Sequence, residues 1–172
     1  MFEYASRFSR FSVSVVLSGY FAIAAARHGH SEILFEEMAN LIDLSEQGNT
    51  FAEFYELDKS FEKGRSRQLW SDTGYLGMVY KGLFGMDFQK GAIKFSPNKV
   101  EGKNGILKTN ETICLRNVKY RKAILDIYVT GFGTNVTSFK LNGEVQSQGN
   151  AILDGWVTGR QLIEIEVAPS IN

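Results

Sequence analysis

The spacing of hydrophobic residues changes once along this chain, near Gly85. Before Gly85, apolar side chains recur every three or four residues, which is the period of an α-helix with one buried face. Three helices are expected there: one over the apolar run 11–26, one from the N-cap Ser31 to a stop at 47–49, and one that ends at Gly85. The second helix is expected to carry an apolar repeat of Leu34, Met38, Leu41 and Ile42.

The third predicted helix is rich in glycine. It carries Gly74, Gly77 and Gly82, and each of these lowers intrinsic helix stability by roughly 1 kcal/mol relative to alanine. Close packing against another backbone is therefore expected to compensate. Its apolar face is expected to be formed by Tyr75, Leu76, Val79, Tyr80 and Leu83.

After Gly85, apolar and polar residues alternate, as they do in strands with one buried face. Asn142-Gly143 predicts a tight hairpin, and 131–133 predicts another turn. Short strands at this spacing favour an antiparallel β-sandwich. The chain is thus expected to be α+β, with a helical domain over 1–86 and a β-sandwich over 87–172. The clearest alternating sets are Ala123, Leu125, Ile127 and Val129, and Ile163, Ile165 and Val167.

The first thirty residues allow two interpretations. Arg7 and Arg10 precede the apolar run, and 22–24 resembles a small-residue cleavage site, which together outline a signal peptide. That interpretation favours a periplasmic or secreted protein over a cytoplasmic one. The alternative is a buried helix that continues through Arg27 and His28. The run is too short and too polar to be a good membrane span.

Composition narrows the possible partners. A hydrophobic content of 44% with 22% charged residues is typical of a folded, soluble protein. The net charge of zero favours neither a nucleic acid nor an anionic membrane as partner. Cys114 is the single cysteine and is expected to be at least half-buried in a strand. His28 and His30 are interpreted as solvated residues near a helix end, so neither a metal nor a cofactor is expected.

A carboxylate among aromatic residues lies between the second and third predicted helices. Glu53 is flanked by Phe51, Phe54 and Tyr55, and Trp70 begins the third helix. Pyranose rings offer apolar faces for stacking and hydroxyls for hydrogen bonds. In an inverting glycosidase, Glu53 could deprotonate water while Tyr55 orients it and Phe51 or Trp70 stacks on the sugar. The other interpretation is an exposed loop glutamate beside aromatic residues that only seal the helix pair.

These residues also resemble a known family. Glu53-Phe54-Tyr55, followed by Gln68-Leu69-Trp70-Ser71 and Gly74-Tyr75, is similar to the base loop and Trp-led helix near the end of the (α/α)6 toroid of six-hairpin glycoside hydrolases. The likeness is to glycoside hydrolase family 63 and mannosylglycerate-hydrolase-like enzymes, and it spans roughly residues 15–168. The later segments that resemble the toroid-to-sandwich junction and the C-terminal β-domain are 82–85, 92–97, 118–121 and 123–126.

The chain departs from that pattern in two ways. Leu57 stands where the family usually has proline, and Lys59-Ser60 replaces its usual Thr-Gly. These changes bear on the loop conformation more than on the carboxylate. The family's general acid lies upstream of anything present in this sequence.

The resemblance implies metal-free, inverting hydrolysis of an α-linked glycoside. Glu53 would be the base, with Glu56 or Asp58 as alternatives, and Phe51, Tyr55 and Trp70 would bind the sugar. The expected partners are an α-glycoside and either the missing upstream toroid or a second copy bound through the helical part, with no nucleic acid and no membrane. The chain alone is expected to be inactive. The alternatives are a non-catalytic carbohydrate-binding or structural β-sandwich module with a helical stalk, or a truncated product.

Overall fold

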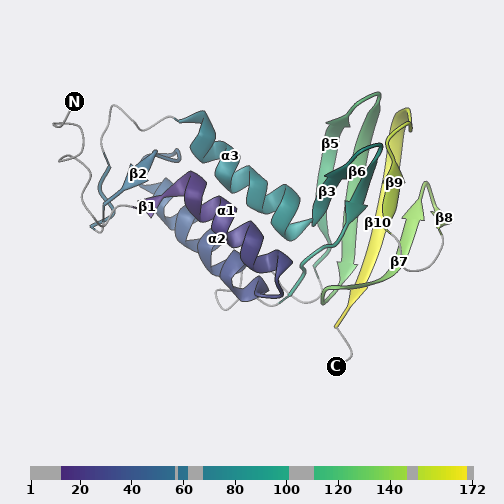
Figure 1. The fold of residues 1–172 in the computed structure, drawn as a ribbon, viewed down its shortest axis with the longest axis horizontal. Helices are drawn as coiled ribbons and strands as arrows, with labels where there is room; N and C mark the ends of the chain where they lie inside the picture. The colour runs from purple at the N-terminus through teal and green to yellow at the C-terminus, as the bar shows by residue number, and fades with distance from the viewer. Residues whose placement is uncertain (1–12, 57, 62–67, 101–110, 147–150, 170–172) are drawn as a thin grey trace. The chain divides into compact units, whose positions relative to one another are not determined.

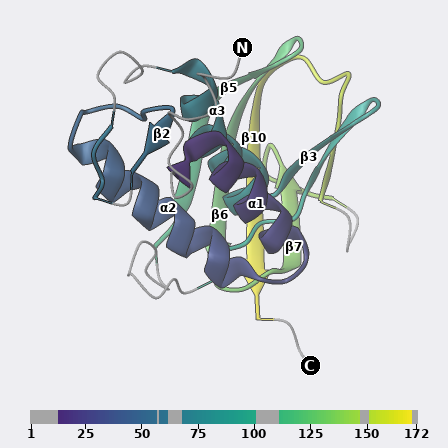
Figure 2. The same ribbon diagram turned by 60° about the vertical axis from the view of Figure 1, so that its left-hand side comes forward.

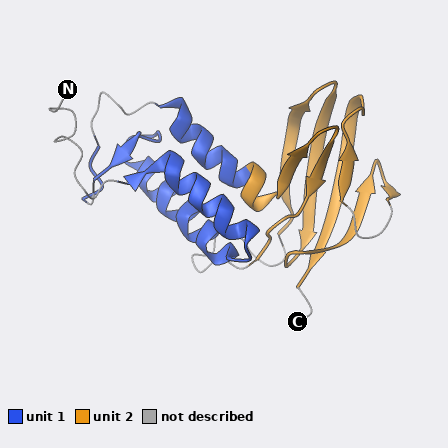
Figure 3. Ribbon diagram, in the orientation of Figure 1, with its two compact units in different colours: residues 1–79 blue, residues 80–172 orange. Residues whose placement is uncertain are grey.

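The chain divides into two compact units, residues 1–79 and residues 80–172 (Figure 3). Among the residues that the structure describes, unit 1 contains three α-helices and a short strand pair, and unit 2 contains a five-stranded and a three-stranded sheet (Figure 1). The fold is therefore mixed α+β, as the sequence predicts. The computed structural model describes residues 13–56, 58–61, 68–100, 111–146 and 151–169. The sequence-based expectations for Arg7, Arg10, Phe11 and Leu57 lie outside these residues.

In unit 1, α1 (Val15–Arg27) packs against both α2 (Ser31–Glu46) and α3 (Leu69–Gly77) (Figures 1 and 2). The chain continues from α3 into a π-helical segment, η2 (Met78–Leu83). Helical structure thus ends just before Gly85, whose φ of +60° lies in the left-handed region that favours glycine. The three helices predicted from the apolar spacing are confirmed.

The helix α1 buries several small residues besides Val15 and Ile23, and exposes three of its large ones. Gly19 and Ala22 are buried, whereas Leu17, Tyr20 and Phe21 are more than half exposed. At Gly19 the backbone of α1 approaches Gly74 of α3 too closely for a side chain between them. The buried residues of α3 are also small: they are Ser71 and Gly74, not the bulkier Tyr75 and Leu76.

The helix α2 follows its predicted pattern with two local differences. Leu34, Met38 and Leu41 are buried, but Ile42 is 37% exposed because it lies one residue further round the helix. Ser31 is the first helical residue rather than the N-cap, and His30 occupies the cap position.

In unit 2, the five-stranded sheet has the order β5-β6-β10-β7-β8. The C-terminal strand, β10, runs parallel to β6 and antiparallel to β7. This finding corrects the expectation of a purely antiparallel arrangement. The parallel pair is unavoidable, because β6 and β7 run in opposite directions and β10 enters between them. The strands are β5 (Ile113–Tyr120), β6 (Ala123–Gly131), β7 (Asn135–Leu141), β8 (Glu144–Val145) and β10 (Gly159–Ala168).

The three-stranded sheet of unit 2 is antiparallel and is formed by β3 (Met86–Gln89), β4 (Ala92–Phe95) and β9 (Ile152–Asp154). The buried ring of Phe95 lies 6.1 Å from that of Phe139 in β7, so the buried faces of the two sheets meet. The predicted alternating residues supply this core. Those buried in β6 and β10 are Ala123, Leu125, Ile127, Val129, Ile163, Ile165 and Val167.

Both predicted turns of unit 2 are confirmed. Asn142 and Gly143 have φ values of 54° and 84° in the β7–β8 hairpin, and Gly131 has a φ of 78° between β6 and β7. The expectation for Cys114 is wrong, since this residue is exposed. Cys114 pairs with Tyr128 on the outer face of the sheet, because the alternation of β5 turns its apolar neighbours inward.

Candidate functional site

Tyr55 closes the loop that carries Glu53. Its side chain is fully buried, and its hydroxyl accepts a hydrogen bond from the Ala52 N–H at 3.0 Å and donates one to the Thr50 carbonyl at 3.1 Å. The ring of Phe61 meets the Tyr55 ring edge-on at 5.6 Å. Tyr55 therefore holds the backbone on the N-terminal side of Glu53.

The C-terminal side of the loop is fixed by a strand pair. Glu53 directly precedes β2 (Phe54–Tyr55), which pairs antiparallel with β1 (Val13–Ser14). Because β1 leads directly into α1, the backbone that follows Glu53 is tied to the start of that helix. Glu53 itself is half-buried.

Phe51 links the same loop to α3. Its ring stacks on that of Tyr75 with a centroid separation of 4.9 Å and an interplanar angle of 22°. Burial raises the pKa of Tyr75 above its usual value. The sequence placed Tyr75 on the apolar face of the third helix but did not assign it to the candidate site. Its position beside Gly74 in the Trp-led helix was the available signal.

Trp70 lies in the first turn of α3 and is 49% exposed. Among the described residues, the ring partners of Phe51 and Tyr55 are Tyr75 and Phe61 rather than Trp70. The structure thus brings Phe51, Glu53 and Tyr55 together in one loop, whereas Trp70 offers a separate, accessible aromatic ring.

The two alternative carboxylates, Glu56 and Asp58, belong to a tight turn. The Glu56 N–H donates to the Ser60 carbonyl at 2.9 Å, and the Ser60 N–H donates to Asp58 Oδ1 at 2.9 Å. Hydrogen bonds from the side chain and backbone of Ser60 hold the pKa of Asp58 below its usual value. Lys59, which lies between Asp58 and Ser60 in the sequence, forms an ion pair with Asp43 of α2. Asp58 thus stabilises the turn through its interaction with Ser60.

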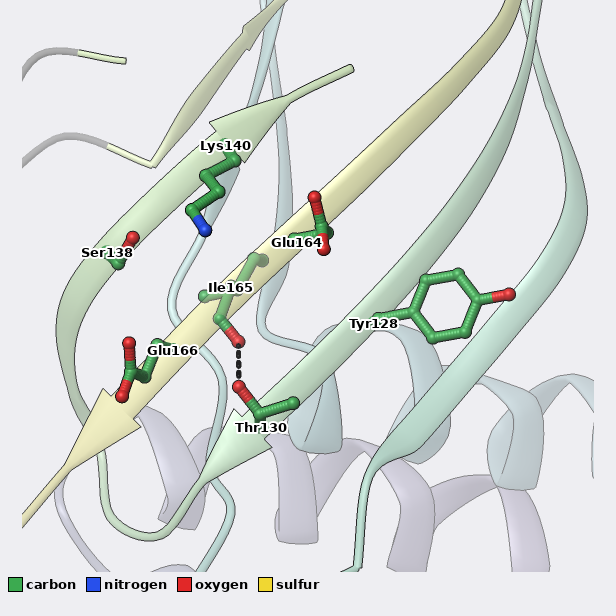
Figure 4. A pocket seen from close by; sticks show the side chains of 7 residues that line it. All are labelled: Tyr128, Thr130, Ser138, Lys140, Glu164, Ile165 and Glu166. Atoms are coloured by element: carbon green, nitrogen blue, oxygen red, sulfur yellow. Dashed lines mark hydrogen bonds between the residues drawn. The ribbon is translucent and has the colours of Figure 1, made fainter. Parts of the chain in front are cut away.

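Unit 2 has a shallow hollow of about 100 Å³ on the outer face of its larger sheet (Figure 4). Lys140 and Glu164 are register partners there, so their charges lie on neighbouring strands. Figure 4 shows the ring of Tyr128 directed away from Glu164 and Glu166. The hollow is lined by Tyr128, Thr130, Ser138, Lys140, Glu164, Ile165 and Glu166.

Over the part of the chain that the structure describes, no group of three or more His, Cys, Asp or Glu side chains is arranged to hold a metal ion. Among the same residues, no helix has the length and hydropathy required to cross a membrane.

Comparison with known proteins does not assign a family to the chain. No protein-family model matches it, and no curated protein matches it.

Proposed function

We propose that this chain is the C-terminal portion of a glycoside hydrolase that cleaves α-linked glycosides with inversion of configuration. In this proposal, the helices of unit 1 are the last helices of an (α/α)6 toroid, and unit 2 is the β-sandwich that follows. Support comes from the resemblance of Glu53-Phe54-Tyr55 and the Trp70 helix to those enzymes. The order of elements, with the three helices before the two larger sheets, agrees with it.

The fixed loop around Glu53 is the observation that carries this function. A general base must stay within hydrogen-bonding reach of the water that it deprotonates. The Tyr55 hydroxyl binds the backbone before Glu53, and the β1–β2 pair binds the backbone after it. The backbone that carries Glu53 is thus held on both sides, and a pre-organised scaffold for the base is what such catalysis needs.

The surrounding aromatic residues supply surface for a sugar. The stacked pair of Phe51 and Tyr75 and the half-exposed ring of Trp70 offer apolar faces on the elements that flank Glu53. The hydroxyl of Tyr55 already forms hydrogen bonds with the loop backbone at Ala52 and Thr50. Its role in this proposal is therefore to position Glu53, and the direct sugar contacts belong to Phe51 and Trp70.

Inverting hydrolysis requires a second carboxyl group, a general acid, roughly 6.5–9.5 Å from the base. The family resemblance assigns that acid to the part of the toroid that precedes this sequence. Glu53 therefore supplies one half of a catalytic pair, and the chain alone is inactive.

The exposed face of α1 supports a further packing partner for unit 1. Leu17, Tyr20 and Phe21 fall at i, i+3 and i+4, so they share one face of the helix. All three are more than half exposed. In the proposed enzyme, preceding helices of the toroid cover this face. In the isolated chain, a second copy can do so.

The test begins with the DNA immediately upstream of this coding sequence. If an open frame there encodes further helices, the extended protein is expressed and incubated with a panel of α-glycosides, and the first-formed anomer is identified by NMR. The expected first product is the β-anomer, with no turnover by the 172-residue chain alone. Retention of the α-configuration, or turnover by the short chain that a substitution within it abolishes, would contradict the proposal.

A further inference from the structure

Three turns of unit 2 are joined at one end of its sheets. The Gly155 N–H donates to the Gly91 carbonyl of the β3–β4 turn at 2.7 Å, and the Gly159 N–H donates to the Lys122 carbonyl of the β5–β6 turn at 3.1 Å. Arg121 Nη1 also donates to the Gly155 carbonyl at 3.4 Å. We call residues 90–91, 120–122 and 154–158 together the turn cluster.

Trp156 projects from the turn cluster and is 79% exposed. Its backbone is nevertheless fixed, because its N–H donates to Asp154 Oδ1 at 2.8 Å. The residue before it has no room for a side chain: a Cβ at Gly155 would lie 2.7 Å from the Gly91 carbonyl oxygen. An exposed indole on a fixed backbone is a pre-organised stacking surface.

Arg121 connects Trp156 to a second aromatic residue. Its guanidinium carbon lies 5.5 Å from the Trp156 ring centroid and 5.4 Å from that of Tyr120. Both distances suit cation–π contact. The ring centroid of Tyr120 in turn lies 6.1 Å from that of Phe88 in β3. Phe88 is 51% exposed. The apolar surface thus extends from Trp156 across Arg121 and Tyr120 to Phe88.

The turn cluster is also positively charged. Its residues include three cations, Lys90, Arg121 and Lys122, and one carboxylate, Asp154. That carboxylate already accepts the Trp156 N–H. An aromatic platform beside unbalanced positive charge suits a ligand that combines an apolar ring face with a negative group.

We propose that the turn cluster binds a uronic-acid unit of an acidic glycan. The apolar face of the pyranose stacks on Trp156, and the carboxylate of the sugar lies towards Arg121 and Lys122. A uronate satisfies both features at once, because its ring carries C–H groups on one face and a carboxylate on its edge. This binding site belongs to unit 2, whereas Glu53 belongs to unit 1, and it goes beyond the proposed hydrolysis.

Two other partner classes fit the surface less well. A stable protein interface buries about 800 Å² on each side, whereas the apolar part of the turn cluster consists of a few rings among charged residues. Single-stranded nucleic acids need a long basic groove with successive stacking rings. The zero net charge of the chain and its single strongly exposed indole at this end do not meet that need.

The test measures binding of tetragalacturonate to the purified 172-residue chain by titration calorimetry, with maltotetraose as the neutral counterpart. Trp156→Ala is expected to weaken tetragalacturonate binding about tenfold or more, and Trp156→Phe by less because a ring remains. Lys122→Ala is expected to weaken binding and to reduce its dependence on salt, because exposed charges are screened by ions. Lys140→Ala, which also removes one positive charge from unit 2, and Val145→Ala, at a position that is 65% exposed, serve as matched controls and should leave binding unchanged.

A spectroscopic measurement separates the two tryptophans. In the Trp70→Phe variant, Trp156 is the single indole, so its fluorescence should shift to shorter wavelength as the sugar covers it. Unchanged affinity in Trp156→Ala would overturn the proposal, as would equal affinity for maltotetraose or tighter binding of a single-stranded oligonucleotide. The titration uses the 172-residue chain, which the proposed function takes to be inactive, so the outcome of this test does not depend on catalysis at Glu53.

Discussion

A Cβ atom built on Gly19 would lie 2.5 Å from the carbonyl oxygen of Gly74. The relationship holds in the other direction, since a Cβ on Gly74 would lie 2.8 Å from the Cα of Val16. The backbones of α1 and α3 therefore touch directly at these two glycines. This contact offsets the low helix propensity of glycine, because it allows the buried faces of both helices to meet.

Gly19→Ala should destabilise the chain even though alanine favours helix. Propensity alone predicts a gain of about 1 kcal/mol. Overpacking against a backbone carbonyl, which cannot rotate away, is expected to exceed that gain and to leave a net loss of about 1–3 kcal/mol in the free energy of unfolding. Urea denaturation followed by circular dichroism measures the difference.

Ser18→Ala is the matched control for this substitution, because it adds helix propensity one residue away at a position that is only half-buried. Its free energy of unfolding should stay within about 0.5 kcal/mol of the native chain. A Gly19→Ala variant that is more stable than the native chain would show that α1 and α3 do not meet at this point.

Local sequence patterns predicted where the helices and strands lie better than they predicted how these elements pack. The repeat of Leu34, Met38 and Leu41 identified both α2 and its buried face. In α1, hydrophobicity alone does not separate the buried Val15 and Ile23 from the exposed Leu17 and Phe21, and it does not predict that Gly19 is buried. The difference arises because backbone proximity is set by the partner helix, which no local pattern contains.

The same limit applies to the sheet and to the site. The alternation in β10 predicts a half-buried strand, but its insertion between β6 and β7 depends on pairing across a long stretch of chain. The stacking of Phe51 on Tyr75 joins residues in different elements. Trp156 was also missed, although Asp154-Gly155 before it is a turn signal that could have drawn attention to an exposed ring.

Tyr55→Phe should loosen the candidate loop. The substitution removes the buried hydroxyl that accepts from Ala52 and donates to Thr50, and leaves both backbone groups without that partner. The expected loss in the free energy of unfolding is about 1–3 kcal/mol. Faster hydrogen exchange at the Ala52 amide would locate the effect. Tyr20→Phe, at a position that is 66% exposed, is the control and should change neither quantity.

Lys99 should make stability rise with pH in the alkaline range. Its side chain is fully buried and donates to the Gly131 carbonyl, while its backbone pairs with Gly133. Burial lowers the pKa of Lys99 below 10.5, and the charge of Glu111 opposes part of that shift. Between the lowered folded pKa and 10.5, the unfolded chain binds more protons than the native chain, so the free energy of unfolding increases with pH.

The comparison that isolates this effect is the native chain against Lys99→Met, which cannot titrate at this position. The free energy of unfolding of the native chain, minus that of Lys99→Met, should increase as pH rises towards 10.5. It should level off above that pH. Two denaturation series that remain parallel over this range would contradict the prediction.

The exposed face of α1 should make the isolated chain self-associate or bind hydrophobic dyes. Leu17 and Phe21 are 65% and 58% exposed on the same face, and apolar surface of this kind favours association. Replacing both with glutamate should shift sedimentation towards the monomer and reduce dye fluorescence. Ala24→Glu, at an exposed position of the same helix, controls for the added charge. A native chain that sediments as a monomer with low dye fluorescence would contradict this expectation.

The decisive substitution for catalysis is Glu53→Gln in the extended enzyme. Glutamine keeps the size of the side chain but cannot accept a proton from water. General-base catalysis contributes about 10²–10⁴-fold, so kcat should fall by at least about 100-fold. Sugar binding should persist, because stacking on Trp70 and Phe51 does not require the carboxylate.

Glu56→Gln and Asp58→Asn are the matched comparisons, since each also exchanges one nearby carboxylate for its amide. Asp58 already accepts the Ser60 N–H within the turn, so its replacement should affect the turn more than the chemical step. Both variants should therefore keep most of the native kcat at equal fold stability. If Glu53→Gln retains near-native kcat while either comparison variant abolishes it, the base is not Glu53, and the turn at 56–60 becomes the catalytic segment.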